Sequence, residues 1–230
     1  MWYPFYAYLD PTYLLLIPVI LLGFYAQWKV RSTYRKYAQV RAAAGLPGAK
    51  VAAGLLEKEK LGGVALEEVG GTLTDHYDPR SRTLRLSSGV ARSSSIAAYG
   101  VAAHEVGHAT QHRDRYAPLA MRNAILPVAN LGSQLLIPLL IGGFIFRWGF
   151  LINVGIILYA FAVVFQLVTL PVELDASRRA LAMLRGTGAV APEEVAGARQ
   201  VLSAAALTYV AATLTAITWL VFLLLGARRG

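Results

Sequence analysis

Four long apolar runs constrain the fold of this chain more than any other feature of its sequence. A transmembrane helix needs ~20 mostly apolar residues to cross about 30 Å of hydrocarbon. Three of the runs are long enough and the first is a little short. Charged residues make up only 15% of the chain, against about 25% in a typical soluble domain. We therefore predict about four transmembrane helices, within Asp10–Trp28, Ala124–Phe146, Trp148–Leu170 and Ala204–Leu225.

Positive charges follow the first apolar run and indicate its orientation. The net charge is +9, and Lys29, Arg31 and Arg35 begin a basic stretch directly after that run. Beside apolar runs, such charge indicates anchoring to anionic membrane lipid, so we expect no nucleic-acid partner. A signal peptide would carry its cations before the run instead. The positive-inside rule predicts a multi-pass protein of the cell membrane, with the chain from residue 29 in the cytoplasm.

The region between the first two runs is the only sizeable polar one, and its patterns predict helices around a small sheet. The stretch "LPGAKVAAGLLEKEKLGG" predicts a short amphipathic helix that ends at its two glycines. "VALEEV" is typical of a strand, and "DPRSR" indicates a turn between two further strand-like pieces. "SSSIAAYGVAAHEVGHATQHR" predicts a helix that begins at a serine cap.

These patterns together predict a mostly α-helical membrane protein with a small α+β catalytic region. Arg147 makes a tight connection between the second and third runs, which favours a helical hairpin. We expect five segments: an N-terminal transmembrane anchor (1–28), a cytoplasmic zincin-like region (29–120), a transmembrane hairpin (121–170), a cytoplasmic helix (171–203) and a C-terminal transmembrane helix (204–230).

The segment "AAHEVGHATQH" carries the clearest chemical signal in the chain. His104 and His108 are four residues apart, so on a helix both imidazoles lie on one face and can reach one zinc ion. Glu105, next to the first histidine, can take a proton from a water that the zinc activates. The chain has no cysteine, which excludes thiolate ligands. The pattern predicts a metallopeptidase with one zinc ion per chain.

A catalytic zinc needs a third protein ligand, and the sequence offers three candidates. His112 continues the four-residue series, but eight residues extend about 12 Å along a helix, too far to share one ion with His104. Glu173 follows the third apolar run, and two crossings return the chain to the side of His108. Asp175 lies in "LDA", which is similar to the Leu-Asp-Gly of site-2-type intramembrane proteases.

The sequence also resembles a known family, the YugP-like membrane zinc metallopeptidases of bacteria. The shared stretches run nearly end to end and include "DPTYLLLIP", "YAQWKV", "LTDHYDPR", "AAHEVGHATQH", "YAPLAMRNAILPVANLGSQ", "FQLVTLPVELDASRRA" and "AALTYVAA". The resemblance implies a zinc-dependent peptidase held in the membrane, with a protein or peptide as its substrate.

More distantly, the chain is similar to the HtpX and CAAX-prenyl protease group, which has a gluzincin-type metal site. In that group a Glu-x-x-Ala-Asp motif follows a membrane segment, and its glutamate is the third zinc ligand. The resemblance places this glutamate at Glu173 and the alanine at Ala176, with Ser177 where the group has aspartate. That aspartate is an outer contact that orients a ligating histidine, so we expect Asp175 or Arg178 to replace it.

Other residues are candidates for outer contacts or for substrate positioning. His112 is a candidate outer contact, and "LTDHYDPR" could offer a strand edge to an extended substrate. A cationic or phenolic side chain should stabilise the oxyanion, and the candidates are His76, Tyr77 and Arg178.

Two other functions fit the same residues. A non-catalytic zinc-binding adaptor or chaperone would need a fourth ligand, from His112 or His76. A site-2-type intramembrane protease would use Asp175 in place of Glu173. In those enzymes the His-Glu-x-x-His motif lies inside a membrane helix, whereas here the polar residues "QHRDR" follow it at once.

Overall fold

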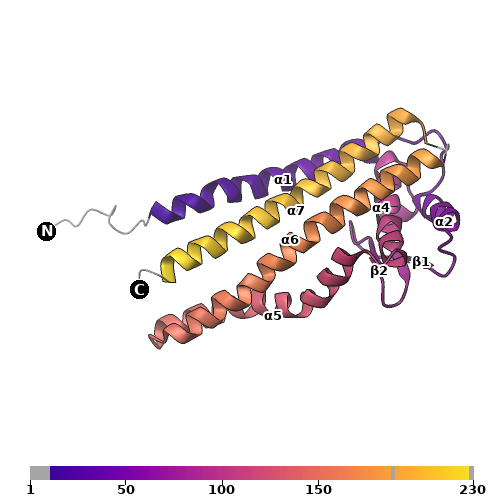
Figure 1. The fold of residues 1–230 in the computed structure, drawn as a ribbon. Helices are drawn as coiled ribbons and strands as arrows, with labels where there is room; N and C mark the ends of the chain where they lie inside the picture. The colour runs from indigo at the N-terminus through magenta and orange to yellow at the C-terminus, as the bar shows by residue number, and fades with distance from the viewer. Residues whose placement is uncertain (1–10, 188–189, 228–230) are drawn as a thin grey trace. The chain divides into compact units, whose positions relative to one another are not determined.

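The computed structural model describes residues 11–187 and 190–227, so the first ten residues of the predicted anchor lie outside it. The described chain is mostly helical, with one small sheet (Figure 1). It divides into two compact units. Unit 1 contains Met1–Gln27, Ala120–Leu170 and Thr208–Gly230, and unit 2 contains Trp28–Leu119 and Pro171–Leu207.

Four long helices account for most of the chain, and each has residues in both units. A short 3-10 turn, η2 (Pro11–Leu15), leads into the first of them. Each helix contains an apolar stretch long enough to cross a membrane, as the sequence predicted for the described residues. They are α1 (Leu16–Ala38), α5 (Ala117–Ile145), α6 (Gly149–Gly186) and α7 (Pro192–Ala227).

The helices extend further than the apolar runs alone indicated. The prediction of one separate helix over residues 171–203 was wrong: its first part continues α6 through Pro171 to Gly186, and its last part begins α7 at Pro192. An internal proline removes one backbone hydrogen bond, which membrane helices tolerate. The polar segment therefore consists of the ends of two long helices.

In unit 1, α5 and α6 form a hairpin with close backbone packing. Arg147 takes the left-handed conformation (φ 51°) in the turn, and the Trp148 amide donates to the Gly143 carbonyl. A Cβ on Gly132 would lie only 2.2 Å from the carbonyl oxygen of Leu158. Small residues allow this close approach of membrane helices.

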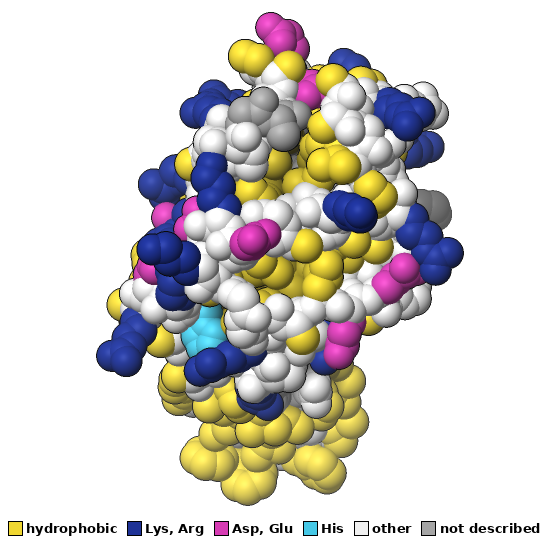
Figure 2. Space-filling view, turned by 90° about the vertical axis from the view of Figure 1, so that its right-hand side faces the viewer, with side chains coloured by type: hydrophobic (Ala, Val, Ile, Leu, Met, Phe, Trp, Pro, Cys, Tyr) yellow, Lys and Arg dark blue, Asp and Glu magenta, His cyan; other side chains and the backbone are white. Residues whose placement is uncertain are grey.

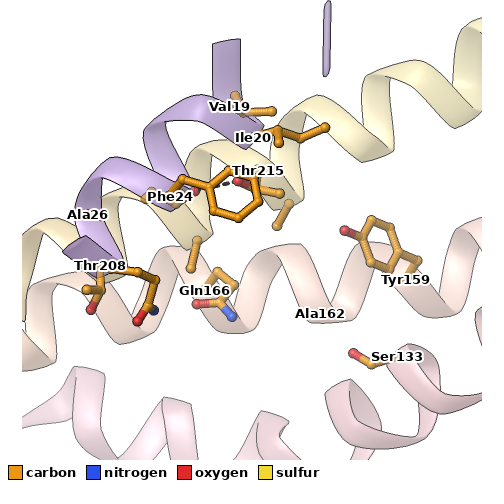
Figure 3. A pocket seen from close by; sticks show the side chains of 15 residues that line it. Val19, Ile20, Phe24, Ala26, Ser133, Tyr159, Ala162, Gln166, Thr208 and Thr215 are labelled. Carbon is orange, nitrogen blue, oxygen red and sulfur yellow. Dashed lines mark hydrogen bonds between the residues drawn. The ribbon is translucent and has the colours of Figure 1, made fainter. Parts of the chain in front are cut away.

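Unit 1 also has an open pocket with a volume of about 540 Å³ between its helices. Figure 3 shows polar side chains among the apolar ones that line it, including Ser133, Tyr159, Gln166 and Thr215. The Thr215 hydroxyl donates to the Ala211 carbonyl within its own helix. Arg122 and Arg147 are the only Lys, Arg, Asp or Glu side chains in the described residues of this unit.

Unit 2 contains the sheet and the short helices. The three strands are β1 (Ala65–Val69), β2 (His76–Asp78) and β3 (Thr83–Ser87), in the order β1-β3-β2. β1 is parallel to β3 and β2 is antiparallel to it, so both outer strands leave one edge without a partner among the described residues. The predicted small sheet is therefore present, together with α2 (Gly48–Lys58) and α3 (Ser88–Ala91).

The helix α4 (Ile96–Arg113) forms the centre of the core of unit 2. The Ser95 hydroxyl accepts a hydrogen bond from the Ala98 amide, which is the serine cap that the sequence predicted. Small residues then let neighbouring helices approach, because Ala102 and Ala103 are fully buried. In Figure 1, α2 and the strands lie beside α4.

Nearly all charged side chains of the described chain lie in unit 2. Figure 2 shows many Lys and Arg side chains on one face, with fewer Asp and Glu among them. Several are paired, such as Arg85 with Glu67 and Arg92 with Glu68. Exposed pairs of this kind contribute little to the stability of the fold. The excess of positive charge is therefore a feature of the surface of unit 2.

Candidate metal centre

Two histidines on α4 form one half of the candidate metal centre. His104 and His108 are one helical turn apart, and their ring centroids lie 4.7 Å apart with the planes at 85°. The His104 side chain is 15% exposed and that of His108 is 11% exposed. The four-residue spacing thus places both imidazoles on one largely buried face.

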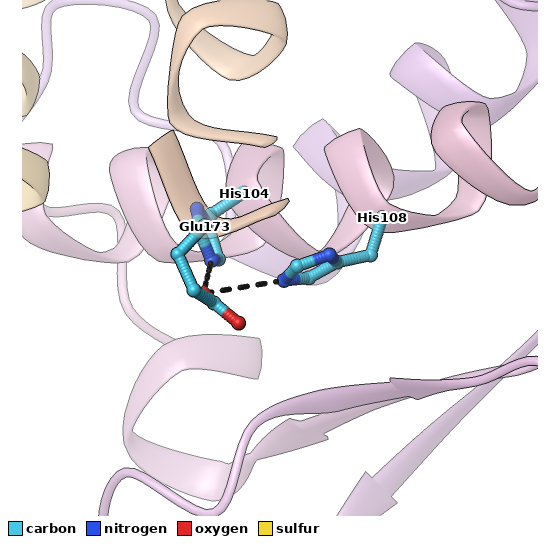
Figure 4. A group of neighbouring side chains, drawn as sticks. All are labelled: His104, His108 and Glu173. Atoms are coloured by element: carbon cyan, nitrogen blue, oxygen red, sulfur yellow. Dashed lines mark hydrogen bonds and ion pairs between the residues drawn. The ribbon is translucent and has the colours of Figure 1, made fainter. Parts of the chain in front are cut away.

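Glu173 on α6 forms the other half. Its Oε2 lies 3.2 Å from His104 Nε2 and 3.5 Å from His108 Nε2, and its side chain is 4% exposed. Figure 4 shows the three side chains converging from two helices. Among the described residues these three form the one group of histidines and acids close enough to hold a metal ion, with ligand atoms within 4.8 Å of one another.

The geometry of this group fits zinc. Ligands of tetrahedral zinc lie about 2.0–2.2 Å from the ion, which places them roughly 3.3–3.6 Å from one another. The two distances from Glu173 Oε2, 3.2 and 3.5 Å, are close to that spacing, and all three ligand atoms lie within 4.8 Å of one another. Two imidazoles and one carboxylate are also a known donor set of catalytic zinc.

The outer ring nitrogens are held so that both Nε2 atoms face Glu173. His104 Nδ1 is hydrogen-bonded to the Ser177 hydroxyl at 3.2 Å, and His108 Nδ1 to Gln111 Oε1 at 3.0 Å. Ser177 itself therefore occupies the place of the aspartate in the related group. Asp175 and Arg178, which we expected in that place, do not bond to His104 in the described part of the chain. Asp175 bonds instead to Gln111, which contacts His108.

Glu105 is also largely buried, with 7% of its surface exposed. Burial by itself lowers the pKa of His108, but the hydrogen bond and charge of Glu173, together with the charge of Glu105, outweigh it and the pKa is raised. Two carboxylates thus create a negative potential at the imidazoles, which favours a bound cation.

The remaining predicted residues lie outside this group. His112 Nδ1 is hydrogen-bonded to the Tyr77 hydroxyl on β2 at 2.8 Å, and burial raises the pKa of Tyr77. His76 Nδ1 contacts the Thr74 carbonyl at 2.8 Å. Arg178 is exposed and forms no hydrogen bond or ion pair with any described residue.

Asp175 belongs to a polar network between α4 and α6 that reaches His108 through Gln111. Its Oδ2 accepts hydrogen bonds from Gln111 Nε2 at 2.9 Å and from Arg179 Nε at 2.7 Å. Arg179 also pairs with Asp114, and its guanidinium lies 5.9 Å from the Tyr116 ring centroid.

Sequence reasoning missed Gln111 and Arg179. A signal for Gln111 was present, because it is three residues after His108 and therefore on the same face of the helix. No sequence pattern distinguished Arg179 from Arg178, because the contacts of each depend on which side of α6 packs against α4.

Comparisons with known proteins agree with this geometry. A family model described as "Putative neutral zinc metallopeptidase" matches residues 12–228. The chain is 47% identical over 203 residues to "Putative membrane protease YugP" of Bacillus subtilis, covering 88% of this chain and 90% of that protein. No solved structure matches. The match over nearly the whole chain confirms the resemblance seen in the sequence, and the chain belongs to this family of membrane zinc metallopeptidases.

Proposed function

We propose that this protein is a membrane-anchored zinc endopeptidase of the gluzincin type. One zinc ion per chain would be held by His104, His108 and Glu173. The observation that carries the proposal is the convergence of these three side chains at zinc-like spacing, with both Nε2 atoms facing one carboxylate oxygen. Family membership supports zinc and a peptide substrate.

An open coordination position favours catalysis over a structural role. Structural zinc sites are closed by four protein ligands, whereas catalytic sites have three. Among the described residues no fourth histidine or acid joins the group. The two candidates for a closing ligand are engaged elsewhere, His112 with Tyr77 and His76 with a backbone carbonyl. This favours a peptidase over a zinc-binding adaptor.

The same contacts favour Glu173 over Asp175 as the third ligand. The Asp175 carboxylate is hydrogen-bonded to Gln111 and Arg179. A site-2-type intramembrane protease would require that carboxylate to leave an ion pair in order to reach the metal, at a cost in free energy.

The proposed mechanism assigns proton transfer to Glu105. Zinc in such a site lowers the pKa of a bound water to about 7 and polarises a carbonyl. Glu105 accepts the proton of the attacking water on its carboxylate and later donates it to the leaving amine. Glu105 is only 7% exposed, which limits its contact with bulk water.

We further propose that the substrate lies extended along β2. The outer edge of this strand is unpaired among the described residues, and β2 contacts α4. An extended peptide can add to such an edge through backbone hydrogen bonds. Of the three predicted candidates for stabilising the oxyanion, Tyr77 is the one held against α4, through His112. We therefore favour Tyr77 over His76 and Arg178.

We also propose that the catalytic unit faces the cytoplasm of the cell membrane. The basic stretch after the first span supports this orientation. Because the chain has no cysteine, single cysteines report sidedness cleanly. In intact cells, an impermeable thiol reagent should label Trp148→Cys in the hairpin turn and leave Glu57→Cys on α2 unlabelled until the membrane is opened. The reverse labelling pattern would show that the catalytic unit faces away from the cytoplasm.

The central experiment compares the wild type with Glu105→Gln in detergent. The amide keeps the shape of the side chain but cannot accept a proton, so cleavage of unfolded casein should fall by about 10²–10⁴-fold. Zinc content should stay at the wild-type level, since Glu105 is not a ligand in the proposal. Equal cleavage rates in the two zinc-loaded proteins would refute the mechanism.

A further inference from the structure

Gln111 is a fully buried polar side chain at the metal centre, and the proposed mechanism does not use it. It lies on α4, three residues after His108, and its exposed fraction is 0%. Its Oε1 lies 3.0 Å from His108 Nδ1. Its Nε2 lies 2.8 Å from the Val172 carbonyl oxygen and 2.9 Å from Asp175 Oδ2. One amide therefore joins His108 to the segment of α6 that carries Glu173.

The partners of this amide determine which way it points. The Val172 carbonyl and the Asp175 carboxylate can only accept hydrogen bonds, so the amide NH₂ must face them. Arg179 Nε donates to the same carboxylate oxygen at 2.7 Å, so this oxygen accepts hydrogen bonds from both side chains. The amide oxygen is then the atom that faces His108.

This orientation determines the tautomer of His108. An amide oxygen can only accept, so His108 Nδ1 must carry the hydrogen that it donates. A neutral imidazole with its hydrogen on Nδ1 has its free lone pair on Nε2, which is the atom that faces Glu173. Ser177, the corresponding partner of His104, is a hydroxyl that can donate or accept and so does not select a tautomer.

We propose that Gln111 is a positioning residue that holds His108 as an Nε2 ligand and holds α4 against the Glu173 segment of α6. The inference rests on the proposed metal site, and it adds a residue whose role is to prepare a ligand without touching the metal. Asp175 and Arg179 complete the device because they orient the amide.

The test measures zinc affinity of the full-length protein in detergent, by competition with a coloured chelator. Gln111→Met keeps the approximate volume and removes all three hydrogen bonds. Thr110→Val is the matched control, because Thr110 is the adjacent buried residue, 2% exposed. Its hydroxyl donates to the Gly107 carbonyl and accepts only a long hydrogen bond, 3.4 Å, from Arg179 Nη1, and it does not contact His108. Any general effect of removing a buried polar group should appear in both variants.

A second pair of variants tests the orientation itself. Gln111→Glu keeps an acceptor for His108 but places a carboxylate against Asp175 and the Val172 carbonyl. In the double variant, Asp175→Asn supplies an amide that can donate to the new carboxylate at position 111. The amide and the carboxylate have then exchanged positions. A merely space-filling role for residue 111 would give no such recovery.

We expect Gln111→Met to weaken zinc binding about 10- to 100-fold, the range for lost outer contacts of a metal ligand, and Thr110→Val to weaken it less than about threefold. Gln111→Glu should bind weakly, and the double variant should recover most of the loss. Equal losses in Gln111→Met and Thr110→Val, or no recovery in the double variant, would overturn the proposal. If the wild type bound no zinc, the proposed function itself would fail. If zinc binding needed Glu173 but not Gln111, only this inference would fail.

Discussion

The two helices that form the candidate metal centre contribute to it in different ways. α4 supplies His104, Glu105 and His108 from five consecutive residues, so a regular helix alone places them on neighbouring positions. The Pro171–Gly186 part of α6 supplies Glu173, together with the outer contacts from Val172, Asp175 and Ser177. Nothing in the local geometry of α6 brings these groups to the histidines. The metal site therefore depends on a helix–helix contact as much as on a motif.

The contact between these helices is made possible by a glycine. A Cβ on Gly107 would lie 2.5 Å from the carbonyl oxygen of Ala176. The absence of a side chain lets the backbone of α6 approach the motif. Gly107 therefore allows the two helices to pack closely, whereas Glu105 and His108 beside it are the candidate functional residues. Gly100, two turns earlier on α4, has a looser environment, with its built Cβ 3.5 Å from Ala198 Cβ.

The largest expected effect comes from removing the contribution of α6 to the metal. Glu173→Ala deletes the proposed third ligand, so we expect a loss of zinc affinity beyond the roughly 10–100-fold that outer contacts contribute. Asp175→Asn, two residues away, should remain within that range. Elemental analysis and chelator competition on the purified proteins measure both. If zinc content fell with Asp175→Asn and survived Glu173→Ala, the ligand assignment would have to be exchanged.

The next effect concerns the packing of the two helices. Gly107→Ala should destabilise the protein by about 1–3 kcal/mol, as overpacking does, and should also weaken zinc binding because α6 must move away. Gly100→Ala is the matched control on the same helix. Its Cβ meets only ordinary contact distances, and it should be neutral or stabilising by up to about 1 kcal/mol, since alanine favours helices. Thermal unfolding in detergent separates the two, and similar melting temperatures for both variants would contradict this account of the contact.

A smaller effect is expected at the outer contact of His104. Ser177→Ala removes the hydroxyl 3.2 Å from Nδ1 and should weaken zinc binding by up to about tenfold, the lower end of the range for such contacts. Ser177→Asp introduces the residue of the related group and supplies a stronger acceptor, so it should bind zinc at least as well as the wild type. Tighter binding in Ser177→Ala than in Ser177→Asp would show that Ser177 does not orient His104.

The smallest effect concerns Asp114, near the surface end of the contact between α4 and α6. The hydrogen bonds from Arg113 and Arg179 lower the pKa of Asp114 below its ordinary value of 3.8. A lowered pKa stabilises the fold above the unfolded-state pKa and loses that contribution as the pH falls through the folded-state value. Asp114→Asn should therefore cost less than about 1 kcal/mol at neutral pH. The difference from the wild type, measured on the metal-free protein, should shrink as the pH falls below about 5 and should be lost once the pH is below the folded-state pKa of Asp114, which lies under 3.8. A constant difference across that range would assign the effect to shape and not to charge.

Much of this architecture was predictable because it depends on local patterns. Apolar runs of membrane-crossing length predicted the four long helices, and turn residues around "DPRSR" predicted two of the strands. His104, Glu105 and His108 could be placed on one helix because their spacing matches the helical repeat. The third ligand could not be predicted from local spacing. The residues alone left Glu173, Asp175 and His112 as candidates, and the resemblance to a known protease group favoured Glu173.

The sequence by itself determined the four apolar segments that are long enough to cross a membrane and the five residues of the His-Glu-x-x-His motif, because each depends on the order of neighbouring side chains. Only the tertiary structure decided that Glu173 faces both Nε2 atoms while Asp175 turns to Gln111 and Arg179. It also decided that Ser177, and not Arg178, contacts His104. Residues on adjacent positions of α6 point in directions 100° apart, so their roles follow from which side of that helix packs against α4.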